Sequence, residues 1–228
     1  MSNLILEIKD LYHSYSEHAL SIENINLEIG AGDRVSILGP SGCGKSTLLR
    51  LIAGLEKPDQ GEIRINDIKV SDNKNLIPPE KRNIGLVVQE KALFPHLSVF
   101  ENICFGIKKN KDKDLIASEL LNLLKINNLK KKYPHEISGG EQQRVALARS
   151  LAPKPNFLML DEPFSALDED LKETLYKDIS QVFSDMRKPE RYQVFSDMSC
   201  AILLVTHDRN EAEIMTNKQI RMEEGKFL

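Results

Sequence analysis

An eight-residue stretch near the N-terminal end, residues 39–46 (Gly-Pro-Ser-Gly-Cys-Gly-Lys-Ser), constrains the fold more than any other segment. It fits the pattern G-x-x-x-x-G-K-[ST], in which the glycines let backbone amides approach phosphate oxygens. An apolar run at residues 35–38 precedes it, and a helical pattern at residues 46–53 follows it and ends at Gly54. The sequence therefore predicts a strand, a phosphate-binding loop and a helix, within an α/β core that binds a nucleoside triphosphate.

Each part of this loop has an expected role at the nucleotide. Lys45 is expected to reach the β- and γ-phosphates, and the Ser46 hydroxyl is expected to bind Mg²⁺. The helix that begins here adds partial positive charge at its N-terminus. The predicted nucleotide-binding residues of the loop are Gly39, Pro40, Ser41, Gly42, Cys43, Gly44, Lys45, Ser46 and Thr47.

A second predicted strand delivers two acids to the same edge of the sheet. Residues 157–160 (Phe-Leu-Met-Leu) are followed directly by Asp161 and Glu162. In open α/β sheets, ligands collect at the carboxyl ends of the strands. We expect Asp161 to hold Mg²⁺, and Glu162 to orient or deprotonate the water that attacks the γ-phosphate.

Apolar patterning predicts how the remaining chain is organised. Alternation at residues 4–8 and 22–29 indicates two early strands, and residues 61–70 indicate a hairpin with a turn near Asn66 and Asp67. Residues 90–137 have helical periodicity and are interpreted as an insertion, and another apolar strand is expected at residues 201–205. Apolar runs that alternate with helices predict a mostly parallel sheet covered on both faces.

One hexapeptide occurs twice in the C-terminal third. Gln-Val-Phe-Ser-Asp-Met stands at residues 181–186 and again at residues 193–198. Two copies are too few for a solenoid. We interpret them as a tandem duplication that lengthens the end of a helix or the loop after it.

The composition excludes several classes of protein. The chain has 228 residues with 31 basic and 34 acidic side chains, a net charge of −3, which argues against a dedicated nucleic-acid binder. No run approaches the roughly 18 apolar residues that a membrane-spanning helix needs. No leader peptide is expected, and three scattered cysteines predict a reduced, cytosolic protein.

A second motif indicates which kind of phosphate-loop protein this is. It lies at residues 137–149 (Ile-Ser-Gly-Gly-Glu-Gln-Gln-Arg-Val-Ala-Leu-Ala-Arg) and resembles the signature of the ATP-binding-cassette (ABC) family. About residues 4–226 match the motif order of that family. The resemblance implies a P-loop NTPase (RecA-like) core with a mostly parallel sheet, an N-terminal antiparallel β part and a helical insertion subdomain. The chain would be one nucleotide-binding domain, residues 1–228, with a catalytic core at 1–89 and 157–228. The helical subdomain and the signature helix would occupy about residues 90–156.

The resemblance also implies roles for further residues. Gln89 and His207 join Glu162 as catalytic residues, and Gln89 joins Ser46 and Asp161 as a Mg²⁺ ligand. Tyr15 corresponds to the aromatic residue that stacks on adenine, with Tyr12 as the alternative. The residues implied to act on ATP across a head-to-tail dimer are Ser138, Gly139, Gly140 and Asp168. The signature departs from the common form at Ile137 and Glu141, where leucine and glutamine are more usual.

The function implied is that of the ATP-hydrolysing subunit of a bacterial importer, peripheral to the cytoplasmic face of the inner membrane. It would pair with a second ABC subunit, contact a membrane permease through residues 89–100, and work with a substrate-binding protein. Residues 78–82 and 92–97 resemble those of uptake systems for polyamines, ferric iron, oxyanions or sugars. The alternatives are a soluble non-transport ABC ATPase, an exporter cassette, or a different phosphate-loop enzyme, which would not need residues 138–140.

Overall fold

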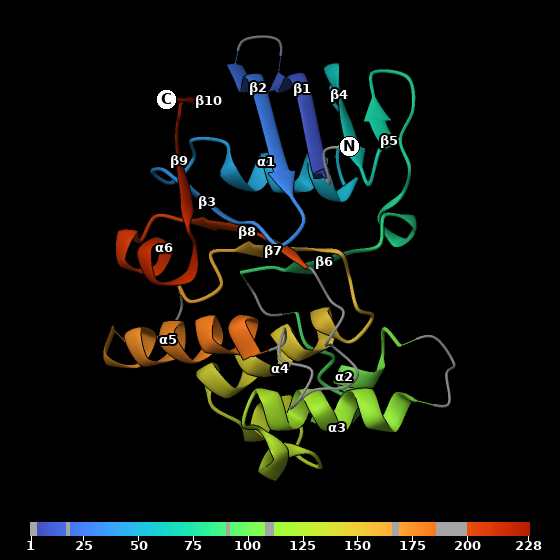
Figure 1. Ribbon diagram of the computed structural model, residues 1–228, viewed down its shortest axis with the longest axis vertical. Coiled ribbons are helices and arrows are strands. Elements are labelled where there is room, and N and C mark those ends of the chain that lie inside the picture. Colours follow the sequence, from blue (N-terminus) through green and yellow to red (C-terminus); the bar gives the residue numbers. More distant parts are fainter. Residues whose placement is uncertain (1–3, 17–18, 90–91, 108–111, 166–168, 186–199) are drawn as a thin grey trace.

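The computed structural model describes residues 4–16, 19–89, 92–107, 112–165, 169–185 and 200–228 (Figure 1). The strands are β1 (Leu4–Ser16), β2 (Ala19–Gly30), β3 (Arg34–Leu38), β4 (Gln60–Ile65), β5 (Ile68–Asp72), β6 (Ile84–Val87), β7 (Phe157–Asp161), β8 (Ala201–Thr206), β9 (Lys218–Glu223) and β10 (Lys226–Phe227). The α-helices are α1 (Lys45–Ala53), α2 (Val99–Cys104), α3 (Lys113–Leu123), α4 (Gly139–Leu151), α5 (Glu169–Asp185) and α6 (Arg209–Met215).

A six-stranded sheet of order β10-β9-β3-β8-β7-β6 forms the centre of the molecule. Its strands pair in parallel from β9 to β6, and only β10 runs antiparallel to its neighbour. Along β7, Phe157 and Met159 pack into one hydrophobic cluster, whereas Leu158 and Leu160 pack into the other. Successive side chains of a strand point to opposite faces, so the sheet is buried on both sides, as the apolar runs predict.

A second, antiparallel sheet of order β2-β1-β4-β5 covers one side of the core. Helix α1 lies between the two sheets and contacts both β2 and β7 (Figure 1). The predicted hairpin is confirmed as β4 and β5, and Asn66 and Asp67 form its turn with φ values of 49° and 62°. Asparagine and aspartate tolerate this left-handed conformation better than most residues, which explains their presence there.

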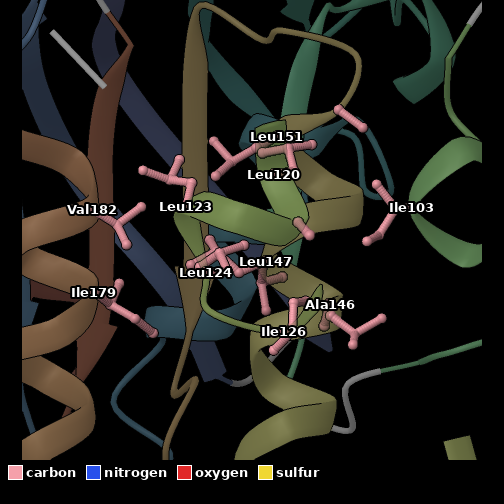
Figure 2. Packing of buried hydrophobic residues seen from close by; sticks show 14 of the residues in the cluster. Ile103, Leu120, Leu123, Leu124, Ile126, Ala146, Leu147, Leu151, Ile179 and Val182 are labelled. Carbon is pink, nitrogen blue, oxygen red and sulfur yellow. The ribbon is translucent and has the colours of Figure 1, made fainter. Parts of the chain in front are cut away.

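Helices cover the other face of the parallel sheet. Figure 1 shows α2, α3, α4 and α5 grouped below β6, β7 and β8. In Figure 2, Leu120 of α3 lies beside Leu151 of α4 and Leu124 lies beside Leu147, while Ile179 and Val182 of α5 approach from the left. The helical periodicity that the sequence shows in this region is therefore the buried face of an α-helical layer.

The structure describes only part of the repeated hexapeptide. The first copy of the repeated hexapeptide begins inside α5, whose last residue is Asp185, whereas the second copy lies outside the described residues. No helix of the described segments combines the length and the apolar character that crossing a bilayer requires.

Candidate nucleotide-binding site

The loop between β3 and α1 takes a backbone path that only glycine permits at two points. Gly44 has a φ of 108°, and a Cβ placed on it would lie 2.4 Å from the carbonyl oxygen of Ser21. A Cβ on Gly39 would lie 2.2 Å from the carbonyl oxygen of Met222. Close backbone approach therefore requires glycine at both positions, and at Gly44 the positive φ requires it as well.

The loop is folded around the ammonium group of Lys45. This side chain is 4% exposed, and its Nζ donates hydrogen bonds of 2.8 Å to the carbonyl oxygens of Gly39 and Pro40. Lys45 is also the first residue of α1, so its charge adds to the positive N-terminal end of that helix. This arrangement suits an anion at the mouth of the loop.

Ser46 and Asp161 form the oxygen pair expected at a magnesium ion. The Ser46 hydroxyl donates a 3.0 Å hydrogen bond to Oδ1 of Asp161, which stands at the carboxyl end of β7. Burial raises the pKa of the Asp161 carboxyl, the Ser46 hydrogen bond opposes this shift, and the neighbouring Glu162 charge adds to it. A hydroxyl and a carboxylate at this spacing fit a hard divalent cation, which prefers oxygen ligands and would offset the burial of the carboxylate.

Glu162 lies between the side chains of Lys45 and His207. Its Oε1 is 3.8 Å from Nζ of Lys45, and its Oε2 is 3.3 Å from Nδ1 of His207. Its φ is +42°, and its backbone amide donates a 2.9 Å hydrogen bond to the carbonyl oxygen of Val205 on β8. A left-handed conformation is strained for glutamate, and β8 holds it so that the carboxylate faces the loop.

Lys45, Ser46 and Glu162 open into one hollow of about 430 Å³, within the size range of small-molecule sites, whereas Asp161 and His207 are not among its lining residues. Tyr15, which is 58% exposed, lines the hollow, whereas Tyr12 is not among its lining residues. The Gln89 amide donates a 3.2 Å hydrogen bond to the Ser165 hydroxyl, which donates in turn to the carbonyl oxygen of Glu162 at 3.1 Å. The residues that line the hollow are Tyr15, Ser21, Ser41, Gly42, Gly44, Lys45, Ser46, Thr47, Gln89 and Glu162.

The signature residues stand apart from this hollow. Ser138 is the N-cap of α4, its hydroxyl donates a 2.9 Å hydrogen bond to Oε2 of Glu141, and the same oxygen accepts from the Ser138 amide at 2.8 Å. A Cβ added to Gly140 would meet no atom within 4 Å, so this helix end is open on the side of that glycine. Within one chain, Ser138, Gly139 and Gly140 are thus not brought to the phosphate loop. Asp168 lies outside the described residues.

Two contacts near the site could not be found from sequence patterns. His13 is buried below Tyr15, with ring centroids 4.8 Å apart at an angle of 85°. Ser165 connects Gln89 to Glu162, although it is 76 residues away from Gln89 along the chain. No local periodicity signals either contact, because both depend on how the strands assemble.

Comparisons with known proteins fit this geometry. The family model described as "ABC transporter" matches residues 22–165. The Fe(3+) ions import ATP-binding protein FbpC of Mesorhizobium japonicum is 42% identical over 226 residues, which are 97% of this chain and 59% of the relative. The putrescine transport ATP-binding protein PotG of Escherichia coli is 42% identical over 229 residues, 98% of this chain and 56% of the relative. The chain thus spans about three fifths of the length of these relatives.

Solved structures share the fold over nearly the whole chain. The cbiO1 protein of Clostridium perfringens, part of the ABC transporter complex cbiONQ, matches with a TM-score of 0.81 at 28% identity and covers 99% of this chain and 87% of its own. The ATP-binding cassette MJ0796, in a dimeric post-hydrolysis state bound to ADP and Pi, matches with a TM-score of 0.77 at 31% identity. The match covers 97% of this chain and 96% of the MJ0796 chain.

Proposed function

Because this chain belongs to the ABC transporter family, we propose that it binds and hydrolyses ATP and so drives import through a separate membrane permease. One observation carries the proposal: Lys45, the Ser46–Asp161 pair and the Glu162–His207 pair converge at the end of the phosphate loop. An anion cradle, an oxygen pair for Mg²⁺ and a carboxylate that can position water are groups that phosphoryl transfer to water uses.

The residues of the hollow have separate tasks in binding. The loop amides and Lys45 hold the phosphates, and the exposed ring of Tyr15 stacks on the adenine. Ser46, Gln89 and Asp161 would hold Mg²⁺, which neutralises charge on the phosphate oxygens. The oxygen chemistry of these three side chains fits that ion.

Glu162 is the group that acts on water. Its carboxylate accepts a hydrogen bond from the attacking water and orients it towards the γ-phosphate, or removes its proton. His207, 3.3 Å from this carboxylate, keeps it turned towards the phosphate loop and contacts the γ-phosphate side of the site.

The proposal includes a second copy of the chain. The open N-terminal end of α4, with Ser138, Gly139 and Gly140, would cover the γ-phosphate held by the partner, and Asp168 would organise the opposing site. A head-to-tail pair with two-fold symmetry completes both sites and buries two ATP molecules. The dimeric state of MJ0796 supports this arrangement.

The permease would dock beside an aromatic cluster that follows Gln89. The Phe94 and Phe105 rings lie 4.2 Å apart, Phe105 is 63% exposed, and the Arg149 guanidinium stands 5.2 Å from the Phe94 centroid. The chain continues from Phe105 into a hollow of about 920 Å³ lined in part by Gly106 and Pro153. An exposed aromatic group beside a hollow suits a short amphipathic helix of a membrane protein, and extends the contact region predicted at residues 89–100.

The remaining organisation follows from the same proposal. The chain acts as one nucleotide-binding domain, with residues 1–89 and 157–228 as the catalytic core and about residues 90–156 as the helical part. It works at the cytoplasmic face of a bacterial membrane, and a substrate-binding protein delivers the cargo. The name of FbpC supports import as the direction of transport.

The proposal is tested by light scattering of Glu162→Gln after gel filtration, with and without Mg²⁺ and ATP. The amide keeps the size of the side chain but cannot act as a base, so hydrolysis stops and the ATP-bound dimer accumulates. Glu213→Gln, an exposed acid on α6, is the matched control and should hydrolyse ATP like the original chain. A Glu162→Gln chain that binds ATP and stays monomeric would contradict the shared site.

The permease contact is tested separately by a photo-reactive amino acid placed at position 105 in cells that carry the transporter. Position 68 is the matched control, because Ile68 is 61% exposed and lies on the antiparallel sheet. Crosslinking to an integral membrane protein from position 105 alone supports the docking surface. Equal crosslinking from both positions, or none from position 105, contradicts it.

A further inference from the structure

Glu211 is a buried acid directly behind the histidine of the site. It lies in the first turn of α6 and is 3% exposed. Its Oε2 accepts a 2.5 Å hydrogen bond from the Thr206 hydroxyl, whereas its Oε1 is buried and has no hydrogen-bond partner among the described residues. A buried carboxyl group with only one of its two oxygens hydrogen-bonded lowers the stability of the fold, so a role in function would explain its presence here.

The surroundings of this acid are rich in carboxylates. The charged and titratable groups that face it come from the N-cap of α6, the end of β7, helix α5 and the residue after β8: Asp208, Glu162, Lys172, Tyr176 and His207. The other strand that α6 contacts, β3, has only Arg34 at its far end, next to Ser184. Burial, with a smaller contribution from the charges of Asp208 and Glu162, raises the pKa of Glu211 to about 8 against the opposing effects of the Thr206 hydrogen bond and of Lys172.

Glu211 is also the end of a hydrogen-bond chain around His207. The Thr206 hydroxyl accepts a 3.0 Å hydrogen bond from the Asp208 amide while it donates to Glu211. The Asp208 carboxylate accepts from the Tyr176 hydroxyl at 3.0 Å and from the Glu211 amide at 3.2 Å. Thr206 and Asp208, the two neighbours of His207 in the chain, are therefore both held by this network. Glu211 anchors the network, because it contacts both of them.

Little room exists for water next to this acid. The hollow that Glu162, His207 and Glu211 line has a volume of about 10 Å³, at the lower limit for a single water molecule. A charged Glu211 could not be hydrated there unless the segment moved. A neutral Glu211 needs no such movement.

We propose that Glu211 is a positioning residue for hydrolysis: as a neutral acid it holds residues 206–208 so that His207 faces Glu162, and its ionisation displaces them. This inference rests on the proposed ATPase function. The group acts through Thr206 and His207, and it does not touch the nucleotide. ATP hydrolysis by the chain is therefore lost at alkaline pH while ATP binding persists.

The first test compares ATP turnover at saturating Mg²⁺ and ATP from pH 6 to pH 9 in three chains: the original, Glu211→Gln and Glu213→Gln. A group with a pKa of about 8 is mostly protonated at pH 7 and about one tenth protonated at pH 9, so turnover of the original chain falls about tenfold. Glu211→Gln keeps an oxygen for the Thr206 hydroxyl and cannot ionise, so its turnover changes less than about twofold over that range. The exposed control Glu213→Gln follows the original profile. Binding of a fluorescent ATP analogue stays within about twofold in all three chains at every pH.

The second test does not depend on catalysis. Infrared difference spectra of the original chain at pH 7 and pH 9 should contain the carbonyl band of a protonated carboxylic acid that disappears at the higher pH, and Glu211→Gln should lack this band. Absence of the band from the original chain at pH 7 overturns the inference, as do equal alkaline losses of turnover in the original and Glu211→Gln chains. If the original chain binds ATP and hydrolyses none at any pH, the proposed function fails as well.

Discussion

Arg82 is a buried cation that ties the end of the phosphate-loop helix to the neighbouring strand, and Arg82→Met should strongly destabilise the fold. The guanidinium donates to the carbonyl oxygens of Ile77 at 2.7 Å, Leu51 at 3.2 Å and Ile52 at 2.7 Å. It also donates to the Val70 carbonyl at 3.1 Å and to the Ser71 hydroxyl at 2.6 Å. The side chain is 3% exposed, and burial lowers its pKa to about 10, so it stays charged at neutral pH.

The expected loss in the free energy of unfolding follows from the hydrogen-bond acceptors that lose Arg82 as their donor. The Leu51 and Val70 carbonyls keep backbone donors, Gly54 at 3.1 Å and Ile77 at 2.8 Å. The Ile52 and Ile77 carbonyls and the Ser71 hydroxyl lose the Arg82 donor. At roughly 1–3 kcal/mol for each buried unpaired group, and less for a hydroxyl that can rotate, the expected loss is about 3–5 kcal/mol.

Equilibrium unfolding in urea measures this loss. Arg50→Met is the matched control, because Arg50 belongs to α1, the helix whose end Arg82 holds. Its side chain is 54% exposed and pairs with Glu56 at 2.9 Å. An exposed ion pair of this kind is worth about 0–1 kcal/mol. If Arg82→Met costs no more than Arg50→Met, the reasoning from buried acceptors is refuted. Since Arg82 does not line the nucleotide hollow, the folded fraction of Arg82→Met should bind ATP with unchanged affinity.

Three shorter predictions concern the site. Tyr15→Ala should weaken ATP binding about tenfold, by roughly 1–2 kcal/mol of stacking, whereas Tyr15→Phe should bind like the original in fluorescence titration. Glu141→Gln removes a carboxylate that holds the Ser138 hydroxyl at 2.9 Å but keeps the helix cap, so light scattering should detect the ATP-dependent dimer at lower concentrations; an unchanged threshold would contradict this. Burial raises the pKa of Glu211 from 4.5 to about 8, so between these pH values the folded chain holds a proton that the unfolded chain has lost. Stability therefore falls as pH rises through that range, by up to about 1.4 kcal/mol per unit, and urea unfolding of Glu211→Gln should lack this slope.

Local signals predicted the elements that carry the phosphate loop and the hairpin. The loop glycines, the apolar run before them and Gly54 after α1 are encoded within the consecutive residues 35–54. The turn at Asn66 and Asp67 follows from residue types that accept a positive φ.

Contacts between distant segments could not be predicted in this way. The acceptors of Arg82 come from α1, from β5 and from the segment before residue 79, so no window of sequence contains them. The same holds for His13 below Tyr15 and for Ser165 between Gln89 and Glu162. The composition of each segment gave no reason to expect these partners, because burial and charge at these positions depend on the assembled sheets.

The parallel register explains why the repeated hexapeptide does not displace the site. Leu38 pairs with Thr206, and Asp161 pairs with Val205, so the phosphate loop, the two acids and His207 all emerge from one edge of the sheet. The second copy of the hexapeptide stands in the sequence between α5 and β8, before Ala201 pairs with Phe157. A slip of one residue in β8 would turn every side chain of this strand to the opposite face, which two hydrophobic clusters oppose. Burial on both faces of the sheet therefore fixes the register of β8, and Nδ1 of His207, which follows this strand, lies 3.3 Å from Oε2 of Glu162.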